Sequence, residues 1–205
     1  MGISKRKPPV KQTVGAQYIC FNKMNTEGEW TEEFEESVTA YPTVVDEEVS
    51  DSADTYEDYA SGDVYDSDTD VQYKEIAVTQ IAFDDQMIAR MRGDIVKDGV
   101  IVSGGRRDRP FFAYGIPIKK KGATVTMRWY GKCKLAENSD RTATSEESHS
   151  SQTDTITIRA YPYNDAKDID VSVDTGAEKY AELTEDKFFA KPLLSAADVE
   201  ALVTA

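Results

Sequence analysis

The segment 123–137, ATVTMRWYGKCKLAE, places the tightest constraint on the fold because its side chains alternate with a period of two. That period belongs to a β-strand whose two faces meet different surroundings. The segment therefore predicts the best-marked strand of the chain. One face is expected to carry Val125, Met127, Trp129, Gly131, Cys133 and Leu135, and the other Thr124, Thr126, Arg128, Tyr130, Lys132 and Lys134.

Other segments with β-branched and aromatic residues between turn-forming ones predict several more strands. The predicted strand at 37–49 breaks at Tyr41-Pro42, since proline has no N–H to donate to a neighbouring strand and favours an edge or a bend. Many short strands with few helices predict a mainly β fold, a β-sandwich or β-barrel with one internal helix and a C-terminal helix. The predicted strands lie in 15–22, 37–49, 71–82, 99–105, 109–122, 155–161 and 168–176.

Two segments carry helix signals. In the first, AFDDQMIARMRGD, Asp84 is placed to cap the start and Gly93 to end the helix in the left-handed conformation. In the second, SAADVEALV, Ser195 is the expected N-cap with Asp198 three residues later. The apolar face of the first helix is expected to fill a core, and consists of Phe83, Met87, Ile88 and Met91.

The formal charge of −14 is concentrated in one part of the chain. Between Met24 and Tyr73 there is no Lys or Arg, whereas 17 of the 38 acidic residues lie there. Binding to duplex DNA requires Lys and Arg to neutralise phosphates, so this charge argues against a surface that grips nucleic acid. It is expected to repel a polyanion.

A chain of 205 residues is expected to form one domain. We predict a flexible N-terminal arm at 1–13, a β domain at 14–190 and a C-terminal arm with a helix at 191–205. Within the domain, 50–70 is expected to be an acidic loop and 136–154 a polar loop. No stretch approaches the roughly 20 apolar residues that cross a bilayer. The two cysteines, Cys20 and Cys133, are expected to be free thiols.

No catalytic group of nucleophile, base and orienting residue can be assembled, so we do not expect an enzyme. The single histidine, His149, lies in the polar segment without a partner at a recognisable spacing. Asp66, Asp68 and Asp70 have the spacing that opens a calcium-binding loop. The glycine and the closing glutamate of such a loop are replaced by Val and Ala. A solvated acidic segment is therefore preferred, and neither a metal nor a cofactor is expected.

A compact basic patch follows the tight turn at Gly104-Gly105, and comprises Arg106, Arg107 and Arg109. Two interpretations stay open for it. The patch is either a solvated loop or a contact for an acidic surface on another subunit.

Three stretches, taken in order, carry a family resemblance. They are VQYKEIAVTQIAFDDQMIARMRGD, RPFFAYGIPIKKKGATVTMRWYGKCKLAE and the polar segment that ends in DTITIRAYP. Their succession of strand, short helix, strand pair and linker resembles the major tail-tube protein of long-tailed siphophages and prophages of Gram-positive bacteria. The likeness covers roughly Val14 to Ala190. The sequence departs from the family's usual form in its very acidic segment 46–70 and in the helix after Lys191.

The resemblance implies a structural virion protein that assembles in the bacterial cytoplasm. Six copies would close a ring with a continuous inner β-barrel, which removes exposed sheet edges. Stacked rings would form a tube around a tape-measure protein, with tail-terminator and distal tail proteins at its ends. DNA would pass through without specific binding, because an acidic bore repels phosphate. The acidic residues that we expect to face this lumen are Glu47, Asp51, Asp63, Asp66 and Asp68.

The polar segment is expected to order against a neighbouring subunit or ring, because a segment with so few apolar residues does not offset its conformational entropy alone. Deleting 138–153 is then expected to leave a folded monomer that does not polymerise. The basic N-terminus and the C-terminal helix are expected to act as similar arms. A plain flexible hairpin loop is the alternative for the polar segment. The expected contact residues are Arg106, Arg107, Arg109, Asn138, Ser145, Ser148 and His149.

Two other functions stay open. One is a different virion ring component on a related β fold, such as a distal tail or decoration protein, since a fold does not determine a function. The other is a β-barrel that binds a small ligand.

Overall fold

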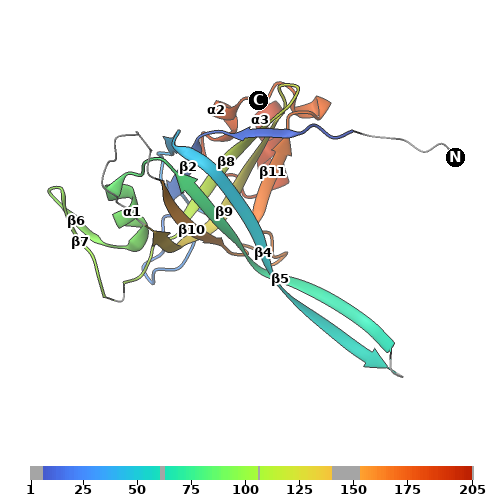
Figure 1. Ribbon diagram of the computed structural model, residues 1–205, viewed down its shortest axis with the longest axis horizontal. Coiled ribbons are helices and arrows are strands. Elements are labelled where there is room, and N and C mark those ends of the chain that lie inside the picture. Colours follow the sequence, from blue (N-terminus) through green and yellow to red (C-terminus); the bar gives the residue numbers. More distant parts are fainter. Residues whose placement is uncertain (1–6, 61–62, 106, 140–152, 205) are drawn as a thin grey trace, which may run out of the picture.

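The computed structural model describes residues 7–60, 63–105, 107–139 and 153–204. The predicted mainly β fold is confirmed, because most of the ordered elements are strands of one antiparallel sheet (Figure 1). The main path of this sheet runs β3-β2-β8-β9-β10-β5-β4, and β1 and β11 pair with β8 and β9. Its strands are β1 (Lys11–Val14), β2 (Gln17–Phe21), β3 (Thr39–Tyr41), β4 (Val44–Ala60), β5 (Asp63–Gln80), β8 (Phe112–Lys120), β9 (Val125–Ser139), β10 (Asp154–Ala160) and β11 (Asp170–Asp174).

The sheet curls back on itself because the strands at the two ends of its path are consecutive in the chain. β3 pairs with β2 at one end, and β4 pairs with β5 at the other. Only Pro42 and Thr43 separate β3 from β4, so the predicted break at this proline is confirmed. We call the resulting body the curled sheet.

β4 and β5 form a long hairpin whose outer half leaves the curled sheet (Figure 1). Their pairing continues from Val44 opposite Gln80 to Ala60 opposite Asp63. The prediction of an acidic loop at 50–70 is therefore wrong. The prediction failed because most residues of this segment are polar on both faces. The segment therefore lacks the alternation of apolar and polar residues by which a half-buried strand is recognised in a sequence.

The first core lies inside the curled sheet. It is built from inward-facing residues of five strands, and α1 (Asp85–Arg92) adds Ile88 and Met91 at one end. The caps of α1 are as predicted: the Asp84 side chain accepts from the Gln86 N–H, and Gly93 is left-handed at φ 73°. Strand residues of this core include Ile19, Ile76, Tyr114, Tyr130, Ile156 and Ile158.

The second core lies on the outer face of β8 and β9, beneath the C-terminal segment. Trp129 is fully buried there and donates from Nε1 to the Phe188 carbonyl at 3.1 Å. Leu193 and Val199 are also buried, so residues 191–205 include anchored structure and are not simply an arm. The described chain also holds a short helix that sequence reasoning missed, α2 (Glu185–Phe188), beside a 3-10 turn (Glu178–Tyr180) and the expected α3 (Ala196–Thr204).

The alternation predicted along 123–137 changes face once. Met127 and Trp129 point into the second core as one face, but Cys133 and Leu135 lie in the first core with Tyr130. The pairing of β8 with β9 shifts between Phe112 and Tyr114, which marks a β-bulge around residues 131 and 132. An extra residue in one strand moves all later side chains to the opposite face. The predicted continuous face is therefore wrong beyond Trp129.

Two smaller elements complete the fold. β6 (Ile95–Lys97) and β7 (Val100–Val102) form a separate two-stranded hairpin that projects beyond α1 (Figure 1). Asp98 and Gly99 turn it with positive φ values of 50° and 81°, as a tight hairpin turn requires. Residues 11–13, expected in the flexible arm, belong to β1. Among the described helices, none is both long and apolar enough to cross a membrane.

Candidate functional site

The curled sheet opens at the end away from α1, between β1 and β4, in a cavity of about 550 Å³ that we call the mouth. β5 links the two ends, since it runs from Lys74 at the mouth to Gln80 near the start of α1. The cavity is far larger than the roughly 30 Å³ that one water occupies in the liquid. Its lining includes Lys11, Val14, Val45, Glu47, Ile118 and Arg128.

The mouth exists because β1 and β4 approach each other without pairing. In the sheet of the described chain, β1 pairs only with β8 and β4 only with β5. At the closed end, by contrast, β2 and β3 pair, and Gln17 bonds to Gln80. One edge of β1 and one edge of β4 therefore stay free beside the cavity, and such edges are able to pair with added chain.

The charged floor of the mouth consists of Lys74, Glu47 and Arg128, and its two cations belong to a network of charged and phenolic groups. Arg128 donates from Nη1 to the Tyr130 hydroxyl at 2.9 Å, and its Nε lies 3.5 Å from Oδ2 of Asp170. Lys74 pairs with the other oxygen of the same carboxylate. Burial raises the pKa of Tyr130 and of the deeper Tyr114, so both phenols stay protonated near neutral pH.

Glu47 is the least well compensated group of the mouth. Burial raises the pKa of its carboxyl to about 7, against the opposing effects of Arg128 and Lys11 and with a small contribution from Asp46. Its Oε1 is buried and has no hydrogen-bond partner among the described residues, and the same holds for the Tyr114 hydroxyl. A buried acceptor without a donor is costly. A donor brought into the mouth from outside would therefore find an acceptor ready.

The described lining of the mouth offers charged and hydrogen-bonding groups to a bound molecule or chain. No nucleophile is activated beside a base here, and burial raises the pKa of the thiols of Cys20 and Cys133, which keeps them as unreactive thiols. The described residues hold no group of three or more metal-ligating side chains.

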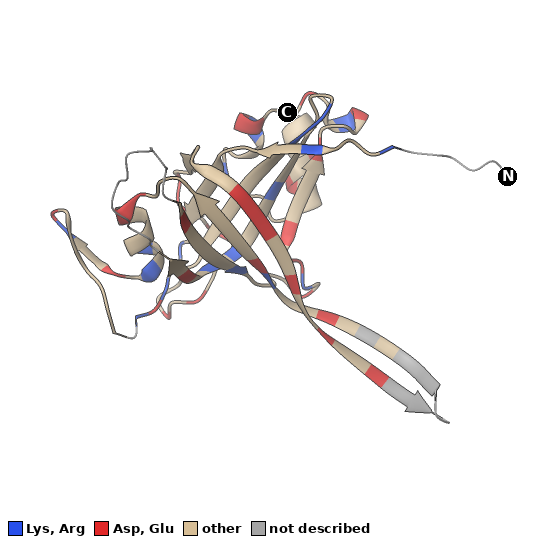
Figure 2. Cartoon of the chain, in the orientation of Figure 1, with Lys and Arg blue, Asp and Glu red and all other residues tan. Residues whose placement is uncertain are grey.

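Of the residues expected to face a lumen, Glu47 and Asp51 line the mouth. Asp63, Asp66 and Asp68 lie on β5 in the outer half of the hairpin. Asp and Glu recur along β4 and along the coloured part of the hairpin (Figure 2). The calcium-loop spacing of Asp66, Asp68 and Asp70 falls on a paired strand and not on a loop.

The basic patch is used largely within the chain. Arg107 donates to the Val102 carbonyl at 2.6 Å and lies 3.6 Å from Asp94. Arg109 donates to the carbonyls of Leu135 and Ala136. Both guanidinium groups therefore position the β6–β7 hairpin and the end of β9. Arg106 lies outside the described residues.

The expected polar loop divides into two parts. Its first residues extend β9, where Asn138 pairs with Ile156 and Ser139 with Thr155. A deletion that starts at 138 would thus also remove strand pairing. Ser145, Ser148 and His149 lie outside the described residues.

Sequence reasoning missed the network at the mouth, which joins Lys74, Arg128, Tyr130 and Asp170. Arg128 was expected on a polar face, whereas it is half-buried and lies on the core side of β9, where it bonds to Tyr130. The sequence did contain a signal for this contact, because Arg128 and Tyr130 are two residues apart and therefore lie on the same face of a strand.

No protein-family model matches the chain, and no curated protein matches it. Membership of the tail-tube family therefore stays a proposal that depends on the residues and the geometry described above.

Proposed function

We propose that the protein is a structural, self-assembling virion protein that polymerises as stacked hexameric rings into the tube of a phage tail. The observation that carries the proposal is the β4–β5 hairpin. From Asp63 to Tyr73, β5 pairs only with β4 among the described strands, and the outer half of the hairpin stands clear of the body (Figure 1). An isolated two-stranded hairpin is at best marginally stable in water. Strand contacts with neighbouring copies would give this one its support.

The charge of the hairpin suits a conduit for DNA. From Val44 to Tyr73 neither strand carries a Lys or Arg (Figure 2). Strands of this kind, joined side by side around a ring, would present carboxylates to the bore. A polyanion would then slide through without being held. The tape-measure protein would occupy the bore before DNA, and terminator and distal proteins would close the ends.

Negative-stain electron microscopy of the purified protein tests the proposal. We expect tubes of stacked rings with a central channel. A protein that stays monomeric at every concentration and ionic strength would overturn it. Single rings that never stack would instead favour another ring component of the virion.

The mouth supports a second candidate, a small-ligand-binding protein. A cavity of about 550 Å³ lies within the range of ligand pockets, and such pockets occur in the mouths of curled sheets. Its charged floor is less apolar than most ligand pockets. Saturable thermal stabilisation of the monomer by a small molecule would favour this candidate over the tube.

A further inference from the structure

The β6–β7 hairpin exposes an unusual amount of apolar surface. Ile95 is 60 % exposed, Val100 62 % and Val102 52 %, and Val96 and Ile101 are also exposed. Five of its six strand residues are thus large, apolar and in contact with solvent. Contiguous apolar patches on soluble proteins mark sites of interaction.

Both faces of the hairpin are apolar, which restricts what covers it. Successive strand residues point to opposite faces, and here successive residues Ile95 and Val96, and Val100 to Val102, are exposed. A flat partner would cover only one face. Full burial therefore requires insertion into a cavity.

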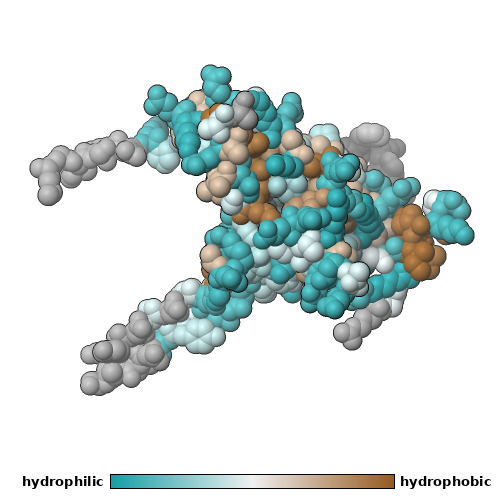
Figure 3. All heavy atoms as spheres, turned by 180° about the vertical axis from the view of Figure 1, so that it is seen from behind, coloured by the Kyte–Doolittle hydropathy of each residue, from teal (hydrophilic) through white to brown (hydrophobic). Residues whose placement is uncertain are grey.

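The mouth is a cavity that offers both apolar walls and charged groups. Its walls include Val14, Val49 and Ile118, and Val45 at its edge is 53 % exposed. A chain does not reach its own mouth with its own hairpin, because the hairpin projects beyond α1 and the mouth opens at the other end of the curled sheet. In Figure 3 the hydrophobic hairpin lies at one side of the molecule, and the side of the β4–β5 hairpin lies opposite.

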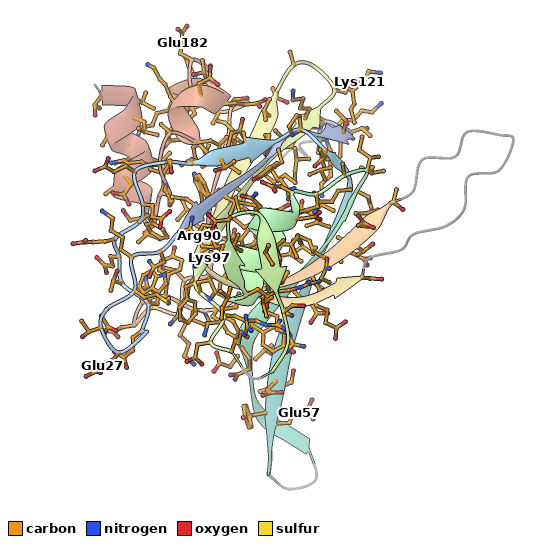
Figure 4. The ribbon with its side chains drawn as sticks, turned by 90° about the vertical axis from the view of Figure 1, so that its left-hand side faces the viewer. Glu27, Glu57, Arg90, Lys97, Lys121 and Glu182 are labelled. Atoms are coloured by element: carbon orange, nitrogen blue, oxygen red, sulfur yellow. The ribbon has the colours of Figure 1, made fainter. Side chains whose placement is uncertain are left out.

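Charge also matches between the two ends. Lys97 is exposed at the tip of the hairpin and has no ion-pair partner within the described chain (Figure 4). The mouth offers Asp51 at its edge and the unpartnered Oε1 of Glu47 at its floor. The lining of the mouth also includes Lys11, whose charge is opposite to that of Asp98 beside Lys97.

From these observations we propose that the β6–β7 hairpin of one copy inserts into the mouth of a second copy, with its apolar faces against the valine walls and Lys97 at the acidic groups. This contact deepens the proposed self-assembly and rests on it. It is head-to-tail, since each copy uses a different surface from its neighbour. Contacts of that type generate rings when the rotation between copies closes and open filaments when it does not.

Two variants test the contact, and each of them changes one of the two surfaces that meet in it. Val96→Asp/Ile101→Asp disables the hairpin, and Val45→Arg disables the mouth. The changed side chains are exposed, so both variants are expected to fold, which circular dichroism checks. Val203→Asp, an exposed apolar residue on α3, is the matched control.

Mass photometry is expected to show association of the wild type and the control, and association weakened about tenfold or more for each variant alone. An equimolar mixture of the two variants should stop at pairs, because one supplies an intact mouth and the other an intact hairpin. The inference would be overturned if either variant associated as strongly as the wild type, or if the mixture of the two variants stayed monomeric.

A charge exchange gives an independent readout. Lys97→Glu and Asp51→Lys are each expected to weaken association, and mixing them should restore it, since alternating copies then present opposite charges at every contact. No restoration would count against the placement of Lys97.

Electron microscopy of the same samples separates this inference from the tube proposal. Tubes from the hairpin variant that equal those of the wild type would overturn the inference and leave the tube proposal standing. If the variants behave as expected in the mixing test but the wild type never forms tubes, the inference stands and the tube proposal is overturned. A wild type that is monomeric throughout would overturn both.

Discussion

Gln17 Nε2 donates to Gln80 Oε1 at 2.5 Å, and this bond joins β2 to β5 across the junction between β3 and β4. Both side chains are fully buried, and 63 residues separate them in the chain. Thr43 donates to the same Oε1 at 3.2 Å. The other amide atoms, Oε1 of Gln17 and Nε2 of Gln80, have no partner in the described chain. The closed end of the curled sheet is thus held by one polar pair inside an apolar core.

Removing one member of this pair should cost more than removing both. Gln80→Met leaves the Gln17 amide buried without a partner, which is expected to destabilise the fold by about 1–3 kcal/mol. The double variant Gln17→Met/Gln80→Met removes the orphaned group, so its cost should be smaller than the sum of the single costs. Urea unfolding of the four proteins in a double-mutant cycle measures the difference. Additive costs would show that the bond contributes nothing to closure.

The anchored C-terminal segment gives a second prediction. Leu193 is 1 % exposed in the second core, and Leu193→Ala is expected to destabilise the protein by about 2–5 kcal/mol through the cavity that it leaves. Val203→Ala, on the exposed side of α3, should change stability by less than about 0.5 kcal/mol. Chemical denaturation compares the two. If Leu193→Ala is also neutral, the segment is an arm that anchors elsewhere.

Features that depend on neighbouring residues were predictable from the sequence. The caps of α1, the Ser195–Asp198 capping box and the break at Pro42 are all confirmed, because each depends on hydrogen bonds or ring geometry within a few residues. The side chain of Asp198 accepts from the Ser195 N–H at 2.9 Å, and its own N–H donates to Ser195 Oγ at 3.2 Å.

Features that depend on pairing between distant strands were not predictable. Of the side chains described in the outer half of the β4–β5 hairpin, none is buried, and the sequence there has no hydrophobic period that would mark its strands. The bulge in β9 leaves the local sequence pattern unchanged and appears only in the pairing with β8. The mouth takes its lining from five strands, and no sequence spacing brings Lys11, Glu47 and Arg128 together.

Substitutions at two glycines with nearly equal φ values distinguish the cost of a left-handed backbone from the cost of a steric clash. Gly93 and Gly28 have φ values of 73° and 79°, but only at Gly93 would a Cβ meet a backbone atom, the Asp108 carbonyl oxygen at 2.5 Å. Gly28→Ala is expected to cost about 1 kcal/mol from the left-handed conformation alone. Gly93→Ala should cost clearly more, because the backbone at Asp108 must move. Thermal unfolding measures both, and equal costs would mean that the 107–109 segment yields freely.

Glu47 makes the stability depend on pH in a direction opposite to that of most carboxylates. Its pKa rises from 4.5 to about 7 on folding, chiefly through burial, so between these values the folded state binds more protons than the unfolded state. Stability from this group therefore falls as pH rises from about 4.5 to 7, by about 3 kcal/mol in total, and is constant above that window. The loss of stability arises because the folded protein must hold an ionised carboxylate in a buried position.

Glu47→Gln keeps the shape of the side chain and removes this titration. The difference in unfolding free energy between the variant and the wild type should therefore grow in favour of the variant as pH rises from about 4.5 to 7. Urea unfolding at dilute protein concentration, where association does not contribute, measures this difference at each pH. Asp51→Asn, which makes the same carboxylate-to-amide change at an exposed residue of the same mouth, is the matched control. A difference that is flat across the window would mean that Glu47 is solvated in the folded protein, and the unpartnered acceptor at the floor of the mouth would then be absent.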